Sequence, residues 1–499
     1  MTAFKRWIIL AIVSSALLLI VMDMTILYTA LPILTRDLGA SASEKLWILN
    51  GYSLVMAGLL PAMGTLGDRL GYRRIFTLGL LVFLAASLTA AFSPVPAVLI
   101  ASRVLLAVGA SMMMPATLSI IRVTFTDERE RGLAIGVWGA IASGGAGLGP
   151  IVGGLLLAHF HWGSVFLINL PIALAALLLT LWIVPRHQGD PGKKWDLFGS
   201  VQIMVAMVAL IYAIKEFARR DGSPALAAAG AALGLVALAL FVRRQIRSAD
   251  PLIDLSLFKI PRFAAGFIVA FVGMFGQMGL QYLVTQRLQL VENLSPLQAG
   301  WFTVSIPLAA VVAGLFAGMR LHRADPIRLK VFALFAAALG TGLYAWRFDG
   351  EPALQIAGLL LLGAGLGAGM TAASHSIMNE APPHKAGMAA SIEEVAYEMG
   401  GASGIAIIGS LSALLYTLSM RIPAGLNVPA NVRDSLDEAL LAADSLPAAS
   451  AAALREAGRS AFDVSFVVVV ASIAAFLAAA ALIVAVIGAR AKSRERTGS

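Results

Sequence analysis

Long stretches without a charged residue set the strongest limit on how this chain can fold. About 20 apolar residues are enough to cross the hydrocarbon core of a bilayer. One uncharged stretch, 132–185, is long enough for two crossings and is interrupted near its middle by the polar, aromatic sequence His159–Gly163. The pattern therefore predicts fourteen membrane-spanning helices. The uncharged stretches of at least 16 residues are 7–22, 46–67, 75–102, 104–121, 132–185, 197–214, 222–242, 263–286, 293–319, 331–346, 352–379, 399–420 and 464–489.

Composition excludes a soluble globular protein. Hydrophobic residues make up 59% of the 499 residues and charged residues only 13%, whereas about a quarter of an ordinary soluble protein is charged. The net charge of +9 does not predict nucleic-acid binding, because basic cytoplasmic loops of a membrane protein explain it. The chain has no cysteine, which excludes disulfides, thiol nucleophiles and cysteine-ligated metals.

The positions of Lys and Arg predict the orientation. An even number of spans places both termini on one side of the membrane, and most Lys and Arg residues then fall in the loops on that side. Because positive residues resist translocation and accumulate in cytoplasmic loops, we expect both termini to be cytoplasmic.

Two regions divide the chain. Residues 186–262 hold two spans between basic segments and predict an inserted helix pair that joins a six-helix bundle at 1–185 to a second one at 263–499. Within the second bundle, residues 421–463 lie outside between the last two spans. Apolar residues recur there at helical spacing, which predicts an extracytoplasmic helical hairpin on the membrane surface or on the protein. A disordered Ala-rich loop has the same composition.

The turn after the second span combines glycines, an acid and arginines. The glycines permit a tight turn and close helix approach, and Asp68 can accept hydrogen bonds from a helix end or an arginine. Such a segment can latch one conformation, although an ordinary basic loop has the same residue types. Its motif residues are Gly64, Asp68, Arg69, Gly71, Arg73 and Arg74.

The fourth and fifth spans carry two further motifs. Arg103 lies inside the fourth span, where an isolated guanidinium is costly unless it is paired or reaches water. We expect it to face the bundle interior, and snorkelling to the outer interface is the alternative. Small residues and a central proline in the fifth span permit close packing and a bend. These residues are Gly145, Gly149, Pro150, Gly153 and Gly154.

The three motifs resemble the signatures of drug exporters of the major facilitator superfamily, and the glycine-rich one resembles the motif typical of antiporters. With Asp23–Pro32 in the first span and Phe166–Pro171 in the sixth, the set is similar to the fourteen-span drug:proton antiporter family, especially to quaternary-ammonium and methyl viologen efflux pumps of the SmvA and QacA type. One departure is Trp162–Ser164, where many members carry Trp-Arg-Trp. The resemblance implies an all-α polytopic fold of two six-helix bundles plus two inserted helices.

Four acids in predicted spans are candidate functional residues, because a carboxylate inside a membrane is costly. Such a group can hold a proton while the site is empty and release it when a cation arrives. Acids at these places in the resembled pumps are implicated in proton coupling or substrate recognition. Pairing with polar groups, or exposure at the cytoplasmic mouth, is the alternative. The four are Asp23 in the first span and Glu393, Glu394 and Glu398 in the thirteenth.

Aromatic and methionine side chains suit a site for delocalised cations, because ring faces attract positive charge and thioethers are pliable. For any single one of them, ordinary core or interface packing is a better explanation than substrate contact, so the prediction rests on the group. The candidates for lining the substrate site are Met24, Tyr28, Tyr52, Trp138, Met274, Met278 and Tyr397.

These features predict a proton-coupled antiporter of a bacterial cytoplasmic (inner) membrane. The expected substrates are lipophilic mono- and divalent cations: quaternary ammonium biocides, methyl viologen, cationic dyes and bisbiguanides. Alternatives are a transporter of a neutral or anionic metabolite and a non-transporting receptor or scaffold. Phosphate-binding, zinc-protease and nucleophile-elbow signatures do not occur in the sequence. We therefore expect no enzyme activity, no cofactor, no metal and no nucleic-acid partner, and a monomer that contacts membrane lipids and protons.

Overall fold

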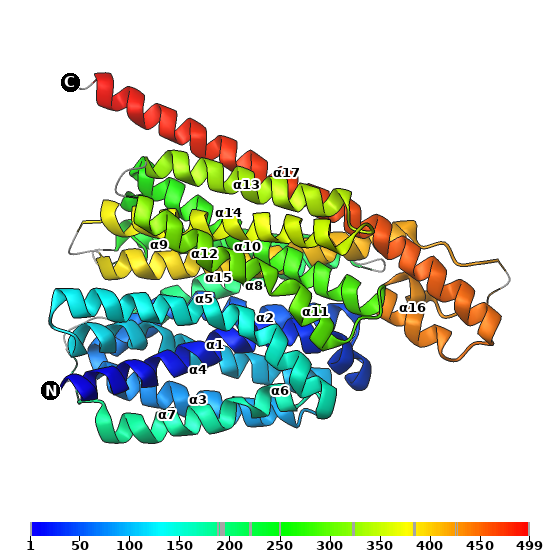
Figure 1. Ribbon diagram of the computed structural model, residues 1–499, viewed down its shortest axis with the longest axis horizontal. Coiled ribbons are helices and arrows are strands. Elements are labelled where there is room, and N and C mark those ends of the chain that lie inside the picture. Colours follow the sequence, from blue (N-terminus) through cyan, green and yellow to red (C-terminus); the bar gives the residue numbers. More distant parts are fainter. Residues whose placement is uncertain are drawn as a thin grey trace.

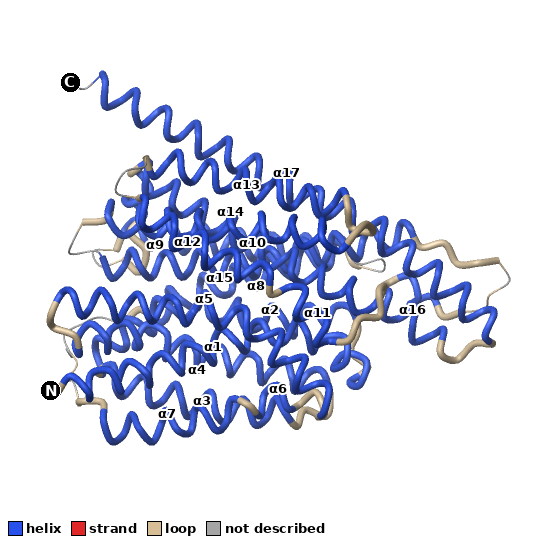
Figure 2. Tube along the Cα trace, viewed as in Figure 1, coloured by secondary structure: helices blue, strands red, loops and turns tan. Residues whose placement is uncertain are grey.

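The computed structural model describes residues 2–186, 189, 195–218, 222–248, 251–321, 325–382, 386–424, 426 and 428–497. Regular structure in these ranges is helical, with no strand (Figure 2). The elements are α1 (Ala3–Leu38), α2 (Ala42–Leu70), α3 (Tyr72–Ala91), α4 (Pro96–Thr124), α5 (Glu128–His159), α6 (Ser164–Leu167), α7 (Asn169–Ile183), α8 (Leu197–Ala218), α9 (Pro224–Arg247), η1 (Leu255–Lys259), α10 (Pro261–Leu290), α11 (Pro296–Thr303), α12 (Ser305–Arg320), α13 (Pro326–Trp346), α14 (Pro352–Glu380), α15 (Ala386–Ser419), η3 (Ala430–Arg433), α16 (Leu436–Ala443) and α17 (Ala448–Thr497).

Thirteen helices in the described residues are long and apolar enough to cross a membrane. Two of these spans are interrupted: α6 with α7 covers Ser164–Ile183, and α11 with α12 covers Pro296–Arg320. The helix α5 is 32 residues long, although its described apolar stretch is the shorter Gly147–His159. With α5 the number of spans reaches the expected fourteen, and the predicted all-α polytopic fold is confirmed.

Local sequence signals mark where the helices begin and end. Ser41 and Glu44 form a capping box at the start of α2, which satisfies backbone N–H groups that have no partner within the helix. Proline occupies the first turn of α4, α9, α10, α13 and α14, where its missing N–H costs nothing. Gly39 ends α1 with φ 62°, a conformation that glycine adopts readily.

Two groups of helices lie side by side (Figure 1). In the first, α1 packs against α5, and α4 packs against α2 and α3; in the second, α14 packs against α12 and α13, and α15 against α10. The inserted helix α8 packs on α9 and also contacts α2 and α15, one helix from each group. The division at 1–185, 186–262 and 263–499 stays a prediction.

The chain termini lie at one end of the helices and α16 at the other (Figure 1). The region 421–463 forms η3, α16 and the first turns of α17, with residues 425 and 427 outside the described ranges. Val432, Leu436 and Leu454 are buried, so this region packs on the protein as a helical structure. It is not an arm separate from the last span, because α17 runs unbroken from Ala448 through that span.

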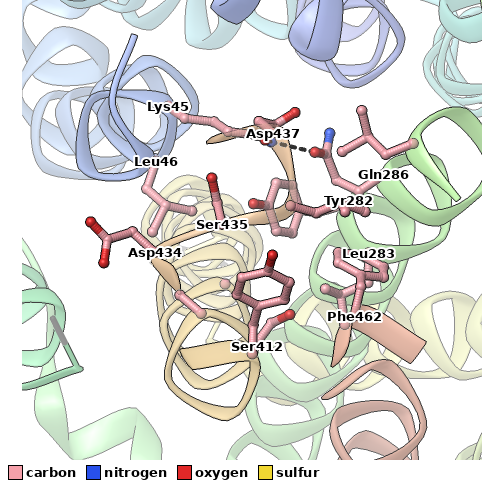
Figure 3. A pocket seen from close by; sticks show the side chains of 15 residues that line it. Lys45, Leu46, Tyr282, Leu283, Gln286, Ser412, Asp434, Ser435, Asp437 and Phe462 are labelled. Carbon is pink, nitrogen blue, oxygen red and sulfur yellow. Dashed lines mark hydrogen bonds and ion pairs between the residues drawn. The ribbon is translucent and has the colours of Figure 1, made fainter. Parts of the chain in front are cut away.

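The two groups meet closely near the outer ends of their helices. A Cβ atom on Gly154 of α5 would collide with the backbone of Leu297 at the start of α11, and one on Gly300 would collide with Pro150. At the same end, a small cavity of about 50 Å³ lies where Lys45 of α2 meets Asp437 of α16. Figure 3 shows the side chains that line it. The outer side is therefore closed in this conformation.

Candidate functional site

A buried ion pair joins the first and fourth spans. Asp23 of α1 and Arg103 of α4 are only 1% and 2% exposed, and Arg103 Nη1 donates to Asp23 Oδ2. Asn169 Nδ2 of α7 donates to the other carboxylate oxygen at 3.3 Å. The Arg103 side chain thus points into the bundle, as expected, and does not snorkel to the interface. Each of the two charges compensates the other in a medium where neither is stable alone.

The guanidinium of Arg103 also binds α2. Its Nε donates to the backbone oxygen of Ile48 at 3.3 Å, and its central carbon lies 4.5 Å from the centroid of the Tyr52 ring. This cation–π contact occupies one face of Tyr52. The hydroxyl of Tyr52 is buried and has no hydrogen-bond partner among the described residues. Tyr52 therefore connects the ion pair to the interior of the first helix group.

Glu398 of α15 is buried and forms no ion pair with any described residue. It is 5% exposed, and its Oε2 has no hydrogen-bond partner among the described atoms. Ser53 of α2 is a hydrogen-bonding neighbour, and Glu398 acts electrostatically on Tyr28 and Tyr52. Glu398 lies on α15, which packs against α2, the helix that carries Tyr52 and Ser53. A carboxylate in such a place requires a proton or a cation.

The other two acids of α15 differ from each other. Glu393 is buried and accepts hydrogen bonds from Tyr397 Oη at 2.5 Å and from Ser374 Oγ at 3.2 Å. Glu394 is half-buried and forms no hydrogen bond within the described residues. Its electrostatic neighbours are Glu393 and Glu398. Hydroxyl groups therefore satisfy Glu393, whereas the charged neighbours of Glu394 within the described residues are both acids.

The candidate lining residues fall into two sets. Tyr28 of α1 donates to Met278 Sδ of α10 at 3.2 Å, which links the two helix groups. Met24 and Met274 are partly buried against the same core. Trp138 of α5 instead donates from Nε1 to Thr117 of α4 at 3.1 Å, a contact within the first group.

The glycine-rich face of α5 packs against α1. Cβ atoms on Gly145, Gly149 and Gly153 would collide with Leu18, Thr25 and Ile26 respectively. These glycines are spaced by four residues and form one face of the helix. Pro150 and Gly154 lie against α11 instead, so α5 fits between the two groups. Thr25 follows Asp23 by two residues. The close packing of Gly149 on Thr25 therefore fixes how far along the axis of α5 the Asp23 side chain lies.

The turn after α2 has the geometry of a rigid corner. Gly71 has φ 94° and ψ 131°, in the region that favours glycine, and Asp68 accepts a hydrogen bond from Tyr72 Oη. Arg73 Nη2 donates to the backbone oxygen of Leu181 at 2.6 Å, which fastens α3 to α7. At Gly64 a Cβ would lie 3.7 Å from Pro115 of α4. The remaining arginines of the motif, Arg69 and Arg74, are exposed.

Sequence reasoning missed several buried polar groups. Asn169 and Ser53 bind the two central acids, and both side-chain polar atoms of Asn50 are buried without a partner in the described part. The sequence signal that could have indicated these three residues is a polar side chain within an apolar span. Arg103 is also not the only buried cation: Arg287, Lys45, Lys215 and Lys330 are buried as well. Arg287 and Lys45 pair with Asp463 and Asp437, 2.8 and 2.5 Å away.

Comparison with known proteins decides the family. Residues 13–430 match the family model of the Major Facilitator Superfamily. The chain belongs to this superfamily. Methyl viologen resistance protein SmvA of Salmonella typhimurium is 40% identical over 466 residues, which cover 92% of this chain and 93% of SmvA. Multidrug efflux pump LfrA of Mycolicibacterium smegmatis is 40% identical over 483 residues, covering 96% and 95% of the two chains.

Solved structures of the superfamily have the same fold. A bacterial homologue of the human lysosomal transporter Spinster, in an inward-facing and unoccupied conformation, superposes with a TM-score of 0.59 at 16% identity, covering 98% of this chain and 99% of the other. A peptide transporter, POT, gives 0.62 at 17% identity, covering 96% and 94%. The predicted resemblance to major facilitator drug-efflux pumps is confirmed, and the chain is a multi-pass protein of the bacterial inner membrane.

Proposed function

We propose that this major facilitator protein exports lipophilic cations in exchange for protons. The observation that supports the proposal most is the buried carboxyl of Glu398, which has an oxygen without a hydrogen-bond partner among the described atoms and interacts electrostatically with Tyr28 and Tyr52. The ring faces attract a delocalised cation, and the carboxylate supplies the opposite charge. The names of SmvA and LfrA, methyl viologen resistance and multidrug efflux, agree with such substrates.

Competition at the acids of α15 would couple the two fluxes. With Glu398 and Glu394 protonated, the empty site is neutral and can reorient at low cost. With the protons lost, the site attracts a cation, and a divalent one can use both carboxylates. A cation and a proton therefore exclude each other at the same groups, which is the requirement for exchange.

Asp23 has a different role in this proposal. Arg103 already compensates its charge, so Asp23 does not offer a free carboxylate to a drug. Protonation of Asp23 would free the guanidinium, which also contacts Tyr52. A proton at Asp23 would thus change the surroundings of Tyr52, which interacts electrostatically with Glu398.

Alternating access would move the two helix groups against each other. The outer ends are in contact at Gly154 and Leu297, so the conformation described here would load from the cytoplasm. Release to the outside then requires this contact to open. We propose the groups 1–185 and 263–499 as the moving bodies, with 186–262 as the connecting pair.

Ethidium transport in everted vesicles with an imposed pH gradient tests the proposal. Accumulation should depend on the gradient and should disappear when the gradient is collapsed. Glu398→Gln should abolish this dependence, whereas Glu351→Gln, which changes an exposed acid, should not. Ethidium movement that is indifferent to the gradient would reject proton coupling. A chain that moves no cation but moves an anionic or neutral metabolite would favour that alternative, and one that moves nothing in proteoliposomes would favour a receptor or scaffold.

A further inference from the structure

A surface groove lies along α17, on different helices from the central acids. It is an open hollow of about 610 Å³ between α17, the end of α10 and the end of α13. Its charged lining residues are Glu456, Arg459 and Asp463, and its apolar ones include Val464, Val468 and Phe348. The uncharged stretch of the last span begins at Val464. The groove therefore crosses the level at which α17 enters the hydrocarbon core from the outside.

The membrane side of the groove is apolar and open. Val464 and Val468 are 52% and 49% exposed and are four residues apart, so they form one strip of the helix surface. A strip of this kind at the outer leaflet suits an acyl chain.

The outer side of the groove carries both signs of charge. Glu456 is exposed and forms no ion pair within the described residues. Arg459, three residues on, donates from Nη2 to the neutral Asn293 Oδ1 at 2.8 Å, and its Nε is buried without a partner among the described atoms. Neither charge is therefore neutralised by an ion pair. The third charged group, Asp463, is already compensated by Arg287 Nε at 2.8 Å.

We propose that this groove binds a zwitterionic phospholipid whose headgroup carries a primary ammonium. The phosphate would lie at Arg459, the ammonium at Glu456, and an acyl chain along Val464 and Val468. A purely anionic headgroup would pair with Arg459, but its negative charge would then lie close to the negative charge of Glu456, which is unfavourable. A trimethylammonium headgroup has the right charges but no N–H to donate to the carboxylate. The groove thus favours an ethanolamine headgroup over a choline one.

Lipid titration of the detergent-purified full chain, read by native mass spectrometry, tests this site independently of transport. Phosphatidylethanolamine should bind at least about fivefold more tightly than phosphatidylcholine, because a hydrogen bond to a charged group is gained. Glu456→Gln should remove this preference, and Arg459→Gln should weaken the binding of both lipids. The matched variants Glu351→Gln and Arg421→Gln change exposed residues outside the groove and should behave as the parent chain.

Equal binding of the two lipids to the parent chain would overturn the proposal. So would tighter binding of phosphatidylglycerol than of phosphatidylethanolamine, or a preference that survives Glu456→Gln. Because Glu456 is exposed, that variant should fold, and its unfolding temperature without lipid checks this. Ethidium transport by the same preparations shows separately whether the proposed transport function holds.

Discussion

At the scale of single residues, the two central acids, Asp23 and Glu398, differ in whether their charge is paired. Asp23 and Glu398 are both buried acids, yet Asp23 has a guanidinium and an amide as partners while Glu398 keeps a free oxygen. A buried pair contributes little net stability when intact but is costly when one partner is removed. The two acids should therefore respond differently to neutralisation.

Removing one partner of the Asp23–Arg103 pair should destabilise the fold. Arg103→Met and Asp23→Asn should each lower the free energy of unfolding by about 3–5 kcal/mol, since each leaves a buried group uncompensated. The double variant should be less destabilised than the two single costs added together. Unfolding in mixed micelles titrated with a denaturing detergent measures all three; strictly additive costs would show that the pair is not coupled.

Glu394→Gln should impair the export of divalent cations more than the export of monovalent ones. Glu394 lies close enough to Glu398 for the two charges to interact, so a dication can use both carboxylates and a monocation needs one. Initial rates of chlorhexidine and ethidium export, compared between the variant and Glu351→Gln, check the expectation. An equal loss for both substrates would contradict it.

At the scale of helices, close packing fixes the central residues. The face of α5 formed by Gly145, Gly149 and Gly153 leaves no room for a methyl group against α1. Small residues allow helix backbones to approach closely in a membrane, where dispersion contacts drive association. Any widening at Gly149 would displace the turn of α1 that carries Asp23.

Gly149→Ala and Gly144→Ala form a matched pair on α5. A Cβ at Gly149 collides with Thr25, whereas one at Gly144 meets open space. Gly149→Ala should cost about 1–3 kcal/mol of stability through overpacking and should reduce ethidium transport, while Gly144→Ala should leave both unchanged. Thermal unfolding and vesicle transport give the two measurements, and similar behaviour of the pair would show that this contact is unimportant.

The outer hairpin binds the first helix group through two ion pairs of different burial. Lys45 Nζ lies 2.5 Å from Asp437, with a side chain only 7% exposed, whereas the Arg36–Asp444 pair at 2.8 Å is 65% and 44% exposed. Exposed pairs contribute about 0–1 kcal/mol, and buried charges lose more when their partner is removed. We expect Lys45–Asp437 to be the stronger restraint on outward opening.

Asp437→Asn should open the outer side more often than Asp444→Asn. The chain has no cysteine, so a cysteine placed at Leu297, where α11 meets Gly154, reports opening without background. Labelling by a membrane-impermeant maleimide should speed up in Asp437→Asn and change little in Asp444→Asn. Equal labelling rates in both variants and the parent would show that these pairs do not restrain the outer face.

At the scale of the whole molecule, the sequence predicted the spans and the family, but not how the charges pair. Uncharged stretches and loop arginines report the membrane directly, because crossing it penalises every charge. That Arg103 binds Asp23 depends on how α4 packs beside α1, which no local pattern encodes. The same holds for Asn169, whose amide reaches Asp23 from α7. The sequence did not predict that α17 continues unbroken into the last span, because the Ala-rich composition of its start is also compatible with a loop. Alanine, however, has the highest helix propensity, and the adjoining span extends the helix.

The length of α17 has a mechanical consequence. At about 1.5 Å per residue, its 50 residues make a rod of about 75 Å, more than twice the roughly 30 Å of the hydrocarbon core. Its outer part packs with α16, and its other end lies with the chain termini (Figure 1). A rigid rod pivoting in the bilayer moves its two ends in opposite directions. A tilt imposed on the outer part of α17 would therefore appear as a displacement of its opposite end, beside the chain termini, and α15 and α10, which pack on α17, would feel the same tilt.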